Sequence, residues 1–233
     1  MKPLLHILFL LLAFTAGARP HTYDVVIVGG TPAGITAAVA AAREGKNSVI
    51  LERSDHVGGL PVNGLGATDI ATRGATAGLF ARFVVLNKAH YTEKYGADSQ
   101  QVRDCSDGYH FEPSVAAETF ARMLAEAGPG RITVLTGRQF DAEARYVEKR
   151  GDRIVSIRIL DRATGREEHY RGAVFIDATY EGDLGAAAGV PFRTGREGAA
   201  EYGEPCAGKI YRWWKHGPDA EGTTYEGDDA IQA

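Results

Sequence analysis

The chain has 233 residues, of which 44% are hydrophobic and 29 are glycine, a composition typical of globular α/β proteins with many tight turns. Its length allows one large domain or two small ones with a substantial core. The 26 basic and 30 acidic residues give a net charge of -4 and are scattered along the chain, which argues against a nucleic acid or an anionic membrane surface as partner.

The first twenty residues have the pattern of a secretory signal peptide. Lys2 precedes an apolar stretch over residues 4–14, and the small residues of segment 16–18 follow as a cleavage site. The apolar stretch is too short for a bilayer, which needs about twenty residues. We therefore expect residues 1–18 to be removed and the mature chain to be exported, periplasmic or extracellular, with no membrane partner. A retained anchor or a buried first helix is the alternative.

A short apolar run over residues 25–28 predicts a strand buried on both faces of a parallel sheet. The chain must then turn sharply, and Gly29 can adopt the backbone angles of that turn. Gly34 has no Cβ to hold the following helix away from the strand. A strand, a glycine turn and a helix in this order predict a site for a dinucleotide.

The helix is expected over residues 32–44. Pro32 fits its first turn, and Gly45 is placed to end it. Its free N–H groups and positive dipole end would face a pyrophosphate. The usual G-x-G-x-x-G pattern has glycine at its third position, where this chain has Thr31, and here a second glycine, Gly30, comes one place earlier. The Thr31 hydroxyl could donate a hydrogen bond to a phosphate.

Residues 48–51 predict a second strand that delivers Glu52. A carboxylate about twenty residues after the turn can accept hydrogen bonds from ribose hydroxyls, and it disfavours a 2′-phosphate. In the following loop, residues 53–70, apolar residues alternate with glycines. This favours backbone that runs close to a flat buried group such as a cofactor ring. A flexible surface loop is the alternative.

Two helices and a third strand come next. Apolar spacing predicts helices over residues 78–89 and 113–127, the second with proline in its first turn. The polar residues 91–109 between them are typical of an excursion or lid, so we interpret residues 71–112 as a helical insertion. A third buried strand is expected over residues 132–135.

From residue 141 the pattern changes to short alternating strands separated by turns. We expect a three-stranded antiparallel meander over residues 141–172, with strands at 142–147, 154–160 and 167–170. It leads into another buried strand at 173–178 and a helix at 184–188.

Cys105 and Cys206 are the only cysteines. They might pair in an oxidising compartment, but two cysteines a hundred residues apart define no disulfide framework. The sequence has no C-x-x-C, and its histidines lack the spacing of metal ligands. We therefore expect no metal site.

This order of elements resembles the glutathione-reductase-type FAD domain. Several segments resemble more closely the FAD-dependent oxidoreductases often labelled xanthan-lyase-like, and the similarity runs from residue 22 onward. These segments are 29–34, 58–60, 63–70, 111–113, 175–184 and 201–204. The resemblance implies an α/β, Rossmann-like FAD/NAD(P)-binding three-layer fold over residues 22–195, with a parallel sheet and an antiparallel β-meander crossover.

The resemblance also implies FAD as cofactor and assigns residues to it. The turn would face the pyrophosphate, the acidic strand end the adenosine ribose, the glycine loop the pyrophosphate and ribityl chain, and a backbone position after the third strand the adenine. The implied residues are Gly29, Gly30, Thr31, Ala33, Gly34, Glu52, Arg53, Gly58, Gly59, Leu60, Phe140, Ala178 and Thr179.

Three further residues are interpreted in the light of the resemblance. The Phe140 side chain is expected in the core. Tyr180 replaces the glycine of the commoner Ala-Thr-Gly form, which argues against a direct cofactor contact there. The loop over residues 63–69 would approach the flavin, and it makes Asp69 the candidate catalytic residue. A hydrogen bond that orders the loop is the alternative role of Asp69.

Members of this family continue well beyond the point where this chain stops. We therefore expect an amino-terminal fragment whose fold is incomplete at the C-terminus, with residues 196–233 as the start of a substrate region. Because the closing elements are absent, the isolated chain is expected to bind FAD weakly.

The leading functional hypothesis is an exported FAD-dependent oxidoreductase in which the flavin accepts a hydride or electrons from a small-molecule or carbohydrate-related substrate and passes them to an unidentified acceptor. Two alternatives stay open: a polysaccharide lyase, as the xanthan-lyase label suggests, and a truncated, non-catalytic FAD-binding module. A lyase needs a base placed beside a carboxylate, and the sequence shows no such group of residues.

Overall fold

The computed structural model describes residues 20–195, 197–204, 207, 209–213 and 222–226. The expected signal peptide lies outside the described residues. The chain divides into two compact units, one ending at Val190 and the other beginning at Pro191. None of the helices within the described ranges has the length and apolar character that a membrane span requires.

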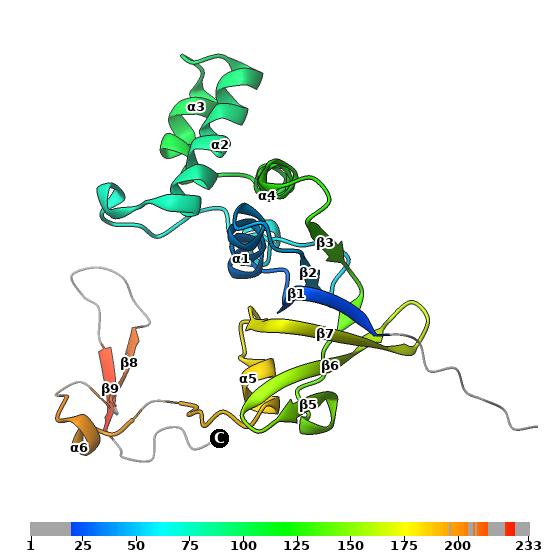
Figure 1. The fold of residues 1–233 in the computed structure, drawn as a ribbon. Coiled ribbons are helices and arrows are strands. Elements are labelled where there is room, and N and C mark those ends of the chain that lie inside the picture. Colours follow the sequence, from blue (N-terminus) through cyan, green and yellow to red (C-terminus); the bar gives the residue numbers. More distant parts are fainter. Residues whose placement is uncertain (1–19, 196, 205–206, 208, 214–221, 227–233) are drawn as a thin grey trace, which may run out of the picture. The chain divides into compact units, whose positions relative to one another are not determined.

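The first unit is built on a seven-stranded sheet (Figure 1). Its parallel part has the order β3, β2, β1, β7, with the bounds Ile132–Leu135, Ser48–Leu51, His21–Val28 and Arg166–Asp177. The antiparallel part consists of β6 (Arg153–Asp161), which pairs with β7, and of β5 (Val147–Arg150) and β4 (Arg138–Gln139), which both pair with β6. The predicted combination of a parallel sheet and an antiparallel meander is confirmed.

Strand β7 corrects the prediction of two separate strands at 167–170 and 173–178. It is one continuous strand that pairs antiparallel with β6 in its first half and parallel with β1 in its second half. Gly172 lies between the two halves and does not end the strand. A Cβ at Gly172 would lie 2.9 Å from Cγ2 of Val26, so this glycine permits the close approach of two strands rather than a turn.

The predicted strand at 142–147 is also wrong. Residues Ala144–Tyr146 form a single 3-10 turn, η4, in which the Tyr146 N–H donates to the carbonyl of Glu143 (3.0 Å). This turn takes the stretch out of the sheet, and the strand begins only at Val147. Short alternation of apolar and polar residues did not distinguish a strand from a turn here.

Three helices belong to the layer on one face of the sheet. Helix α1 (Pro32–Arg43) packs against β1 and β2, and α4 (Pro113–Ala127) and α2 (Gly78–Tyr95) pack in the same hydrophobic cluster. Ile27 and Ile50 point from the strands into this cluster and are fully buried. The small side chains of α1 let the helix lie close on the sheet, as the sequence predicted.

A second hydrophobic cluster lies on the opposite face. Val26 and Leu51 from the parallel strands meet Ile157 and Tyr170 from the meander, and α5 (Asp183–Ala187) closes this cluster. Successive strand residues point to opposite faces, so β1 contributes to both cores. Helices, sheet and meander therefore form the predicted three layers (Figure 1).

The insertion between β2 and α4 contains more helical residues than predicted. After the 3-10 turns η1 (Leu60–Val62) and η2 (Arg73–Ala75), α2 continues to Tyr95 rather than ending at residue 89. Helix α3 (Gln100–Asp104) and the turn η3 (Ser106–Gly108) follow. Tyr91, Cys105 and Tyr109 of this predicted polar excursion are buried and belong to the helical core.

The Cys105 thiol donates to the carbonyl of Val102 (3.2 Å). Its suggested partner Cys206 lies outside the described residues.

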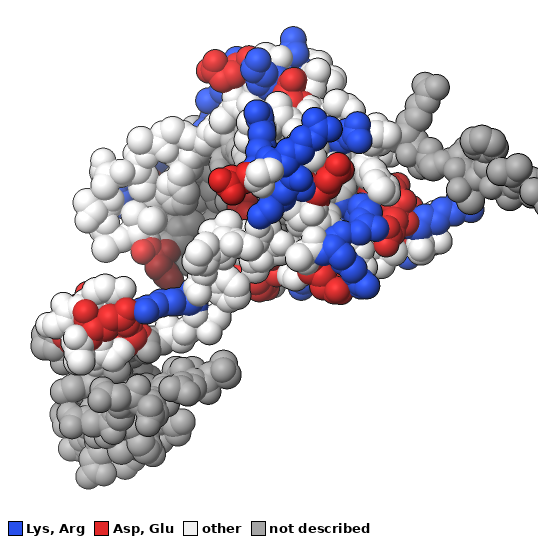
Figure 2. Space-filling view, turned by 60° about the horizontal axis from the view of Figure 1, so that its bottom comes forward, with Lys and Arg blue, Asp and Glu red and all other residues white. Residues whose placement is uncertain are grey.

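In the second unit, the described elements are α6 (Ala199–Tyr202) and a hairpin of β8 (Lys209–Trp213) and β9 (Gly222–Glu226). On the face that Figure 2 shows, acidic and basic side chains are interspersed.

Candidate functional site

The turn after β1 has a geometry that requires glycine at its first position. Gly29 has a φ of +102°, and its N–H donates to the carbonyl of Leu51 (2.9 Å). A Cβ on Gly29 would lie 2.6 Å from the carbonyl oxygen of Ala178. The turn is therefore held between the ends of β2 and β7, and both the backbone angle and the space exclude a side chain.

Helix α1 starts tightly against this turn. A Cβ on Gly34 would overlap the carbonyl oxygen of Gly29 and lie 3.3 Å from the Cβ of Ala178. Thr31 caps the helix, because its Oγ1 accepts from the Gly34 N–H (3.4 Å). The same hydroxyl donates to the carbonyl of Ala178 (2.7 Å). This corrects the expectation that the Thr31 hydroxyl donates to a phosphate, since its single proton is already used.

The first turn of α1 can receive an anion. In the described part of the chain, the N–H groups of Thr31 and Ala33 form no hydrogen bond, and the first turn holds no acidic residue. Free N–H groups and the positive end of the helix dipole favour negative charge here. The bound group that this arrangement fits is a diphosphate.

Glu52 connects the two loops that follow β1 and β2. Its Oε2 accepts from the Gly30 N–H (2.6 Å), and its Oε1 accepts from the N–H of Ser54 (2.7 Å). The single proton of the Ser54 hydroxyl is shared between Oε1 of Glu52 (2.8 Å) and the carbonyl of His56 (2.8 Å). A carboxylate has about four acceptor positions, so one remains for a ribose hydroxyl. Glu52 thus has a structural role in the turn in addition to the ribose role that the sequence predicted.

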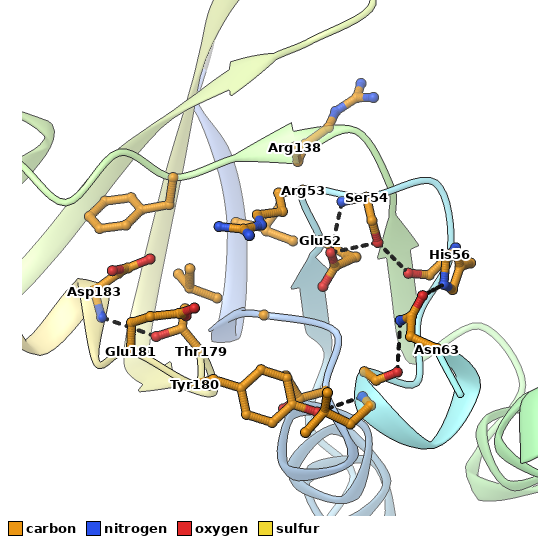
Figure 3. A pocket seen from close by; sticks show the side chains of 17 residues that line it. Glu52, Arg53, Ser54, His56, Asn63, Arg138, Thr179, Tyr180, Glu181 and Asp183 are labelled. Atoms are coloured by element: carbon orange, nitrogen blue, oxygen red, sulfur yellow. Dashed lines mark hydrogen bonds between the residues drawn. The ribbon is translucent and has the colours of Figure 1, made fainter. Parts of the chain in front are cut away.

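A cavity of about 320 Å³ lies beside these groups (Figure 3), within the size range of small-molecule sites. The predicted cofactor residues that line it are Gly29, Thr31, Glu52, Arg53, Gly59, Leu60, Phe140 and Thr179. The predicted residues outside its lining are Gly30, Ala33, Gly34, Gly58 and Ala178, which belong to the turn, the loop and the strand end that support it. The side chain of Phe140 is buried in the second core, as expected.

Sequence reasoning missed several lining residues, namely Ser54, His56, Arg138, Glu181 and Asp183. Only Ser54 carried a usable signal, since a serine two residues after a carboxylate can close a local hydrogen-bonded turn. The others reach the cavity through the fold.

The charges around the cavity are mixed. Burial, followed by the nearby carboxylates of Glu181 and Asp177, raises the pKa of Asp183. Arg138 is engaged by Glu168 (3.1 Å) and Asp161 (3.5 Å), whereas Arg53 forms no ion pair with another described residue. Of the two arginines that line the cavity, Arg53 therefore has the guanidinium group that is available to a ligand.

One peptide unit at the edge of the cavity is fixed on both sides. Gly59 has φ +57° and ψ -142°, a conformation that glycine tolerates best. Its carbonyl accepts from Nδ2 of Asn63 (2.8 Å), and the N–H of the same peptide, on Leu60, donates to the Tyr180 hydroxyl (2.8 Å). Tyr180 lines the cavity, and the expectation that it makes no direct cofactor contact stays a prediction.

His56 extends this network to the surface. Its Nδ1 lies 2.6 Å from Oδ1 of Asp55, and its Nε2 lies 3.1 Å from Oδ1 of Asn63. Both partners are acceptors, because the Asn63 amide nitrogen is used on Gly59. The imidazole satisfies both only when each ring nitrogen carries a proton. The hydrogen bond to Asp55, with a smaller one to Asn63, accordingly raises the pKa of His56 above 6.5.

We expect the His56 contribution to the order of the glycine loop to depend on pH. Because the folded pKa is raised, the contribution is complete below the unfolded pKa of about 6.5 and is lost as the pH rises through the folded pKa. An NMR titration of the His56 ring should show the raised pKa. Asp55→Asn should bring it back toward 6.5, whereas Asp152→Asn, which changes an exposed carboxylate outside the network, should not. Equal His56 pKa values in all three proteins would contradict the assignment.

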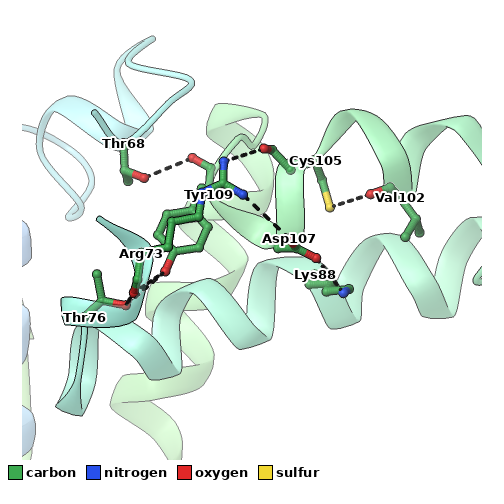
Figure 4. Close-up of polar contacts among 9 residues, drawn as sticks. Thr68, Arg73, Thr76, Lys88, Val102, Cys105, Asp107 and Tyr109 are labelled. Carbon is green, nitrogen blue, oxygen red and sulfur yellow. Dashed lines mark hydrogen bonds and ion pairs between the residues drawn. The ribbon is translucent and has the colours of Figure 1, made fainter. Parts of the chain in front are cut away.

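Asp69 lies outside the cavity lining and is exposed. The loop around it is tied to the end of the insertion, since the Thr68 N–H donates to the carbonyl of Tyr109 (3.0 Å). Arg73 lies over the Tyr109 ring at 4.6 Å (Figure 4), and it donates to Oγ of Ser106 (2.6 Å). These contacts hold the loop against the end of the insertion, and Asp69 does not reach the described cavity.

Among the described residues, no group of three or more His, Cys, Asp and Glu residues could hold a metal ion.

A sequence model of the protein family described as "FAD dependent oxidoreductase" matches residues 24–229. Among curated proteins, none matches the chain.

Solved structures of other proteins align with parts of this chain. The glycerol-3-phosphate dehydrogenase from Bacillus halodurans complexed with FAD is 12% identical over 91% of this chain and 49% of that chain, with a TM-score of 0.49. The L-proline dehydrogenase from P. horikoshii is 16% identical over 77% and 59%, with a TM-score of 0.48. The flavin-dependent monooxygenase PieE in complex with FAD and substrate is 17% identical over 76% and 34%, with a TM-score of 0.48.

This chain spans less than two thirds of the length of each of these proteins. Their low identities and TM-scores carry no argument about activity or substrate.

Proposed function

This chain belongs to the FAD-dependent oxidoreductase family, and from that premise we propose that it binds FAD in the cavity between the first turn of α1, Glu52 and the Gly59–Leu60 loop. The first turn of α1 would hold the diphosphate. Glu52 would accept a hydrogen bond from the adenosine ribose, and the wall that contains Phe140 would contact the adenine. The Gly59–Leu60 loop would lie beside the rest of the cofactor.

The observation that carries this proposal is the convergence of two recognition elements on one cavity. The N–H groups of Thr31, which lines the cavity, and of Ala33, which follows in the same helical turn outside the lining, have no partner among the described residues and suit an anion. The remaining acceptor position of Glu52, which also lines the cavity, suits a hydroxyl. A diphosphate attached to a ribose carries both groups in one molecule. Gly29 and Gly34, whose Cβ atoms would collide with neighbouring backbone, allow the first turn of α1 to lie this close to the strand ends.

Bound FAD supplies the capacity to accept a hydride or an electron pair from an organic substrate. The residues of this chain bind and orient it. We further propose that the substrate is a small molecule or is related to carbohydrates, as the sequence resemblance suggests, and that the protein is exported, which the pattern of residues 1–18 supports.

The proposal predicts that the chain recognises the ADP half of FAD. Titration of the 233-residue chain with FAD, followed by flavin fluorescence, should give saturable binding. ADP should displace the flavin, and FMN, which has no adenosine, should not. Displacement by FMN as effective as that by ADP, or no FAD binding at all, would contradict the proposal.

A further inference from the structure

Tyr180 stands out among the lining residues because the residue is 56% exposed and yet its hydroxyl is held in place. The residue directly follows Thr179 at the end of β7. Its ring reaches across to the Gly59–Leu60 loop, where the hydroxyl accepts from the Leu60 N–H at 2.8 Å (Figure 3). A Cβ on Gly59 would overlap this hydroxyl and lie 3.1 Å from Cδ of Pro32, the first residue of α1. The hydroxyl therefore lies near the helix end that borders the cavity.

The Tyr180 hydroxyl still has its own O–H proton to donate. A phenol can both accept and donate, and Tyr180 uses its oxygen to accept from Leu60. Its own proton has no acceptor among the described residues. A hydroxyl that accepts a hydrogen bond also becomes a better donor, because the bonds polarise one another.

The neighbouring groups cannot supply this donor. The Thr31 hydroxyl donates to Ala178, and the Leu60 N–H is used on Tyr180 itself. The carbonyl of Gly59 is only an acceptor and is already bonded to Asn63. The Tyr180 hydroxyl is thus a side-chain donor that remains free beside the first turn of α1 within the described residues.

We propose that Tyr180 is a specificity-determining residue of the cofactor site and that its hydroxyl donates a hydrogen bond to the diphosphate of the bound dinucleotide. The inference rests on the proposed FAD site and adds to it a residue that replaces the usual glycine. The Tyr180 hydroxyl then links the loop to the ligand, because it accepts a hydrogen bond from the Leu60 N–H and donates one to the phosphates.

The test compares ligands with and without phosphates on the full chain. In Tyr180→Phe the ring stays and the hydroxyl is lost. A hydrogen bond to a charged group corresponds to roughly a tenfold loss of affinity or more. We expect such a loss for FAD and for ADP, measured by calorimetry, and no change for adenosine. Tyr95→Phe makes the same chemical change on α2, outside the cavity lining, and should leave all three affinities unchanged.

The outcomes separate the inference from the proposed function. Unchanged ADP affinity in Tyr180→Phe would overturn the inference alone. An equal loss for ADP and adenosine would also overturn it, because it would show that Tyr180 only supports the loop. If the unmodified chain binds neither FAD nor ADP, the proposed function fails and the inference fails with it. Melting temperatures of the ligand-free proteins should agree, which excludes unfolding as the cause of a loss.

Discussion

Gly34→Ala should destabilise the protein and abolish FAD and ADP binding, although alanine is the better helix former by about 1 kcal/mol. The added Cβ would overlap the carbonyl oxygen of Gly29 and press on the Cβ of Ala178 at 3.3 Å. One of these atoms belongs to the backbone and the other to the short side chain of alanine, so no flexible group can move aside. Overpacking of this kind costs about 1–3 kcal/mol. Relief requires α1 to move away from β1, which displaces the N–H groups that we assign to the diphosphate.

Urea denaturation gives the stability change, and calorimetry with ADP gives the binding change. Gly185→Ala is the matched control, because Gly185 is also helical and a Cβ there would meet only Oδ2 of Asp177 at 3.7 Å, an ordinary contact. The control should retain both stability and ADP affinity. A Gly34→Ala protein that is as stable as the unmodified chain and binds ADP equally well would show that the helix does not need this close approach.

The elements that the sequence predicted well are those specified by local rules. Helix α4 has the predicted bounds, since proline starts it and a glycine follows it, and β2 is the predicted short buried run. Strand β3 has the predicted bounds but is not buried as predicted, because it lies at the edge of the sheet and Val134 is exposed. The roles of Gly29 and Gly34 followed from a pattern that directly encodes backbone geometry. The fold class could therefore be predicted before any contact was known.

The parts that the sequence could not predict depend on contacts between distant residues. The hydroxyl of Thr31 was expected at a phosphate, but the nearest acceptor is Ala178, far along the chain. Tyr180 meets the Leu60 N–H across a comparable separation. Whether β7 is one strand or two depends on which neighbour each half pairs with, and Gly172 looks the same in either case. Tertiary partners, not local propensities, decide these features.

Glu52→Gln should weaken ADP binding by about tenfold to a hundredfold and also reduce stability. The carboxylate of Glu52 accepts hydrogen bonds from the Gly30 and Ser54 N–H groups, and it shares the Ser54 hydroxyl proton with the carbonyl of His56. An amide keeps one oxygen and places an NH2 group where the second oxygen was. Either the donor on Gly30 or those on Ser54 then lose their acceptor, and a partly buried unpaired donor costs about 1–3 kcal/mol.

The ribose contact of Glu52 can be separated from its support of the turn by a second ligand. In the unmodified chain, 2′-deoxy-ADP should bind more weakly than ADP, because the remaining acceptor position of Glu52 loses its hydroxyl partner. In Glu52→Gln that difference should shrink, which is the coupling a double-mutant cycle measures. Glu44→Gln, an exposed residue at the end of α1, is the control and should preserve the difference. If Glu52→Gln lowers both affinities by the same factor, Glu52 acts only through the turn, and the ribose is recognised by another group.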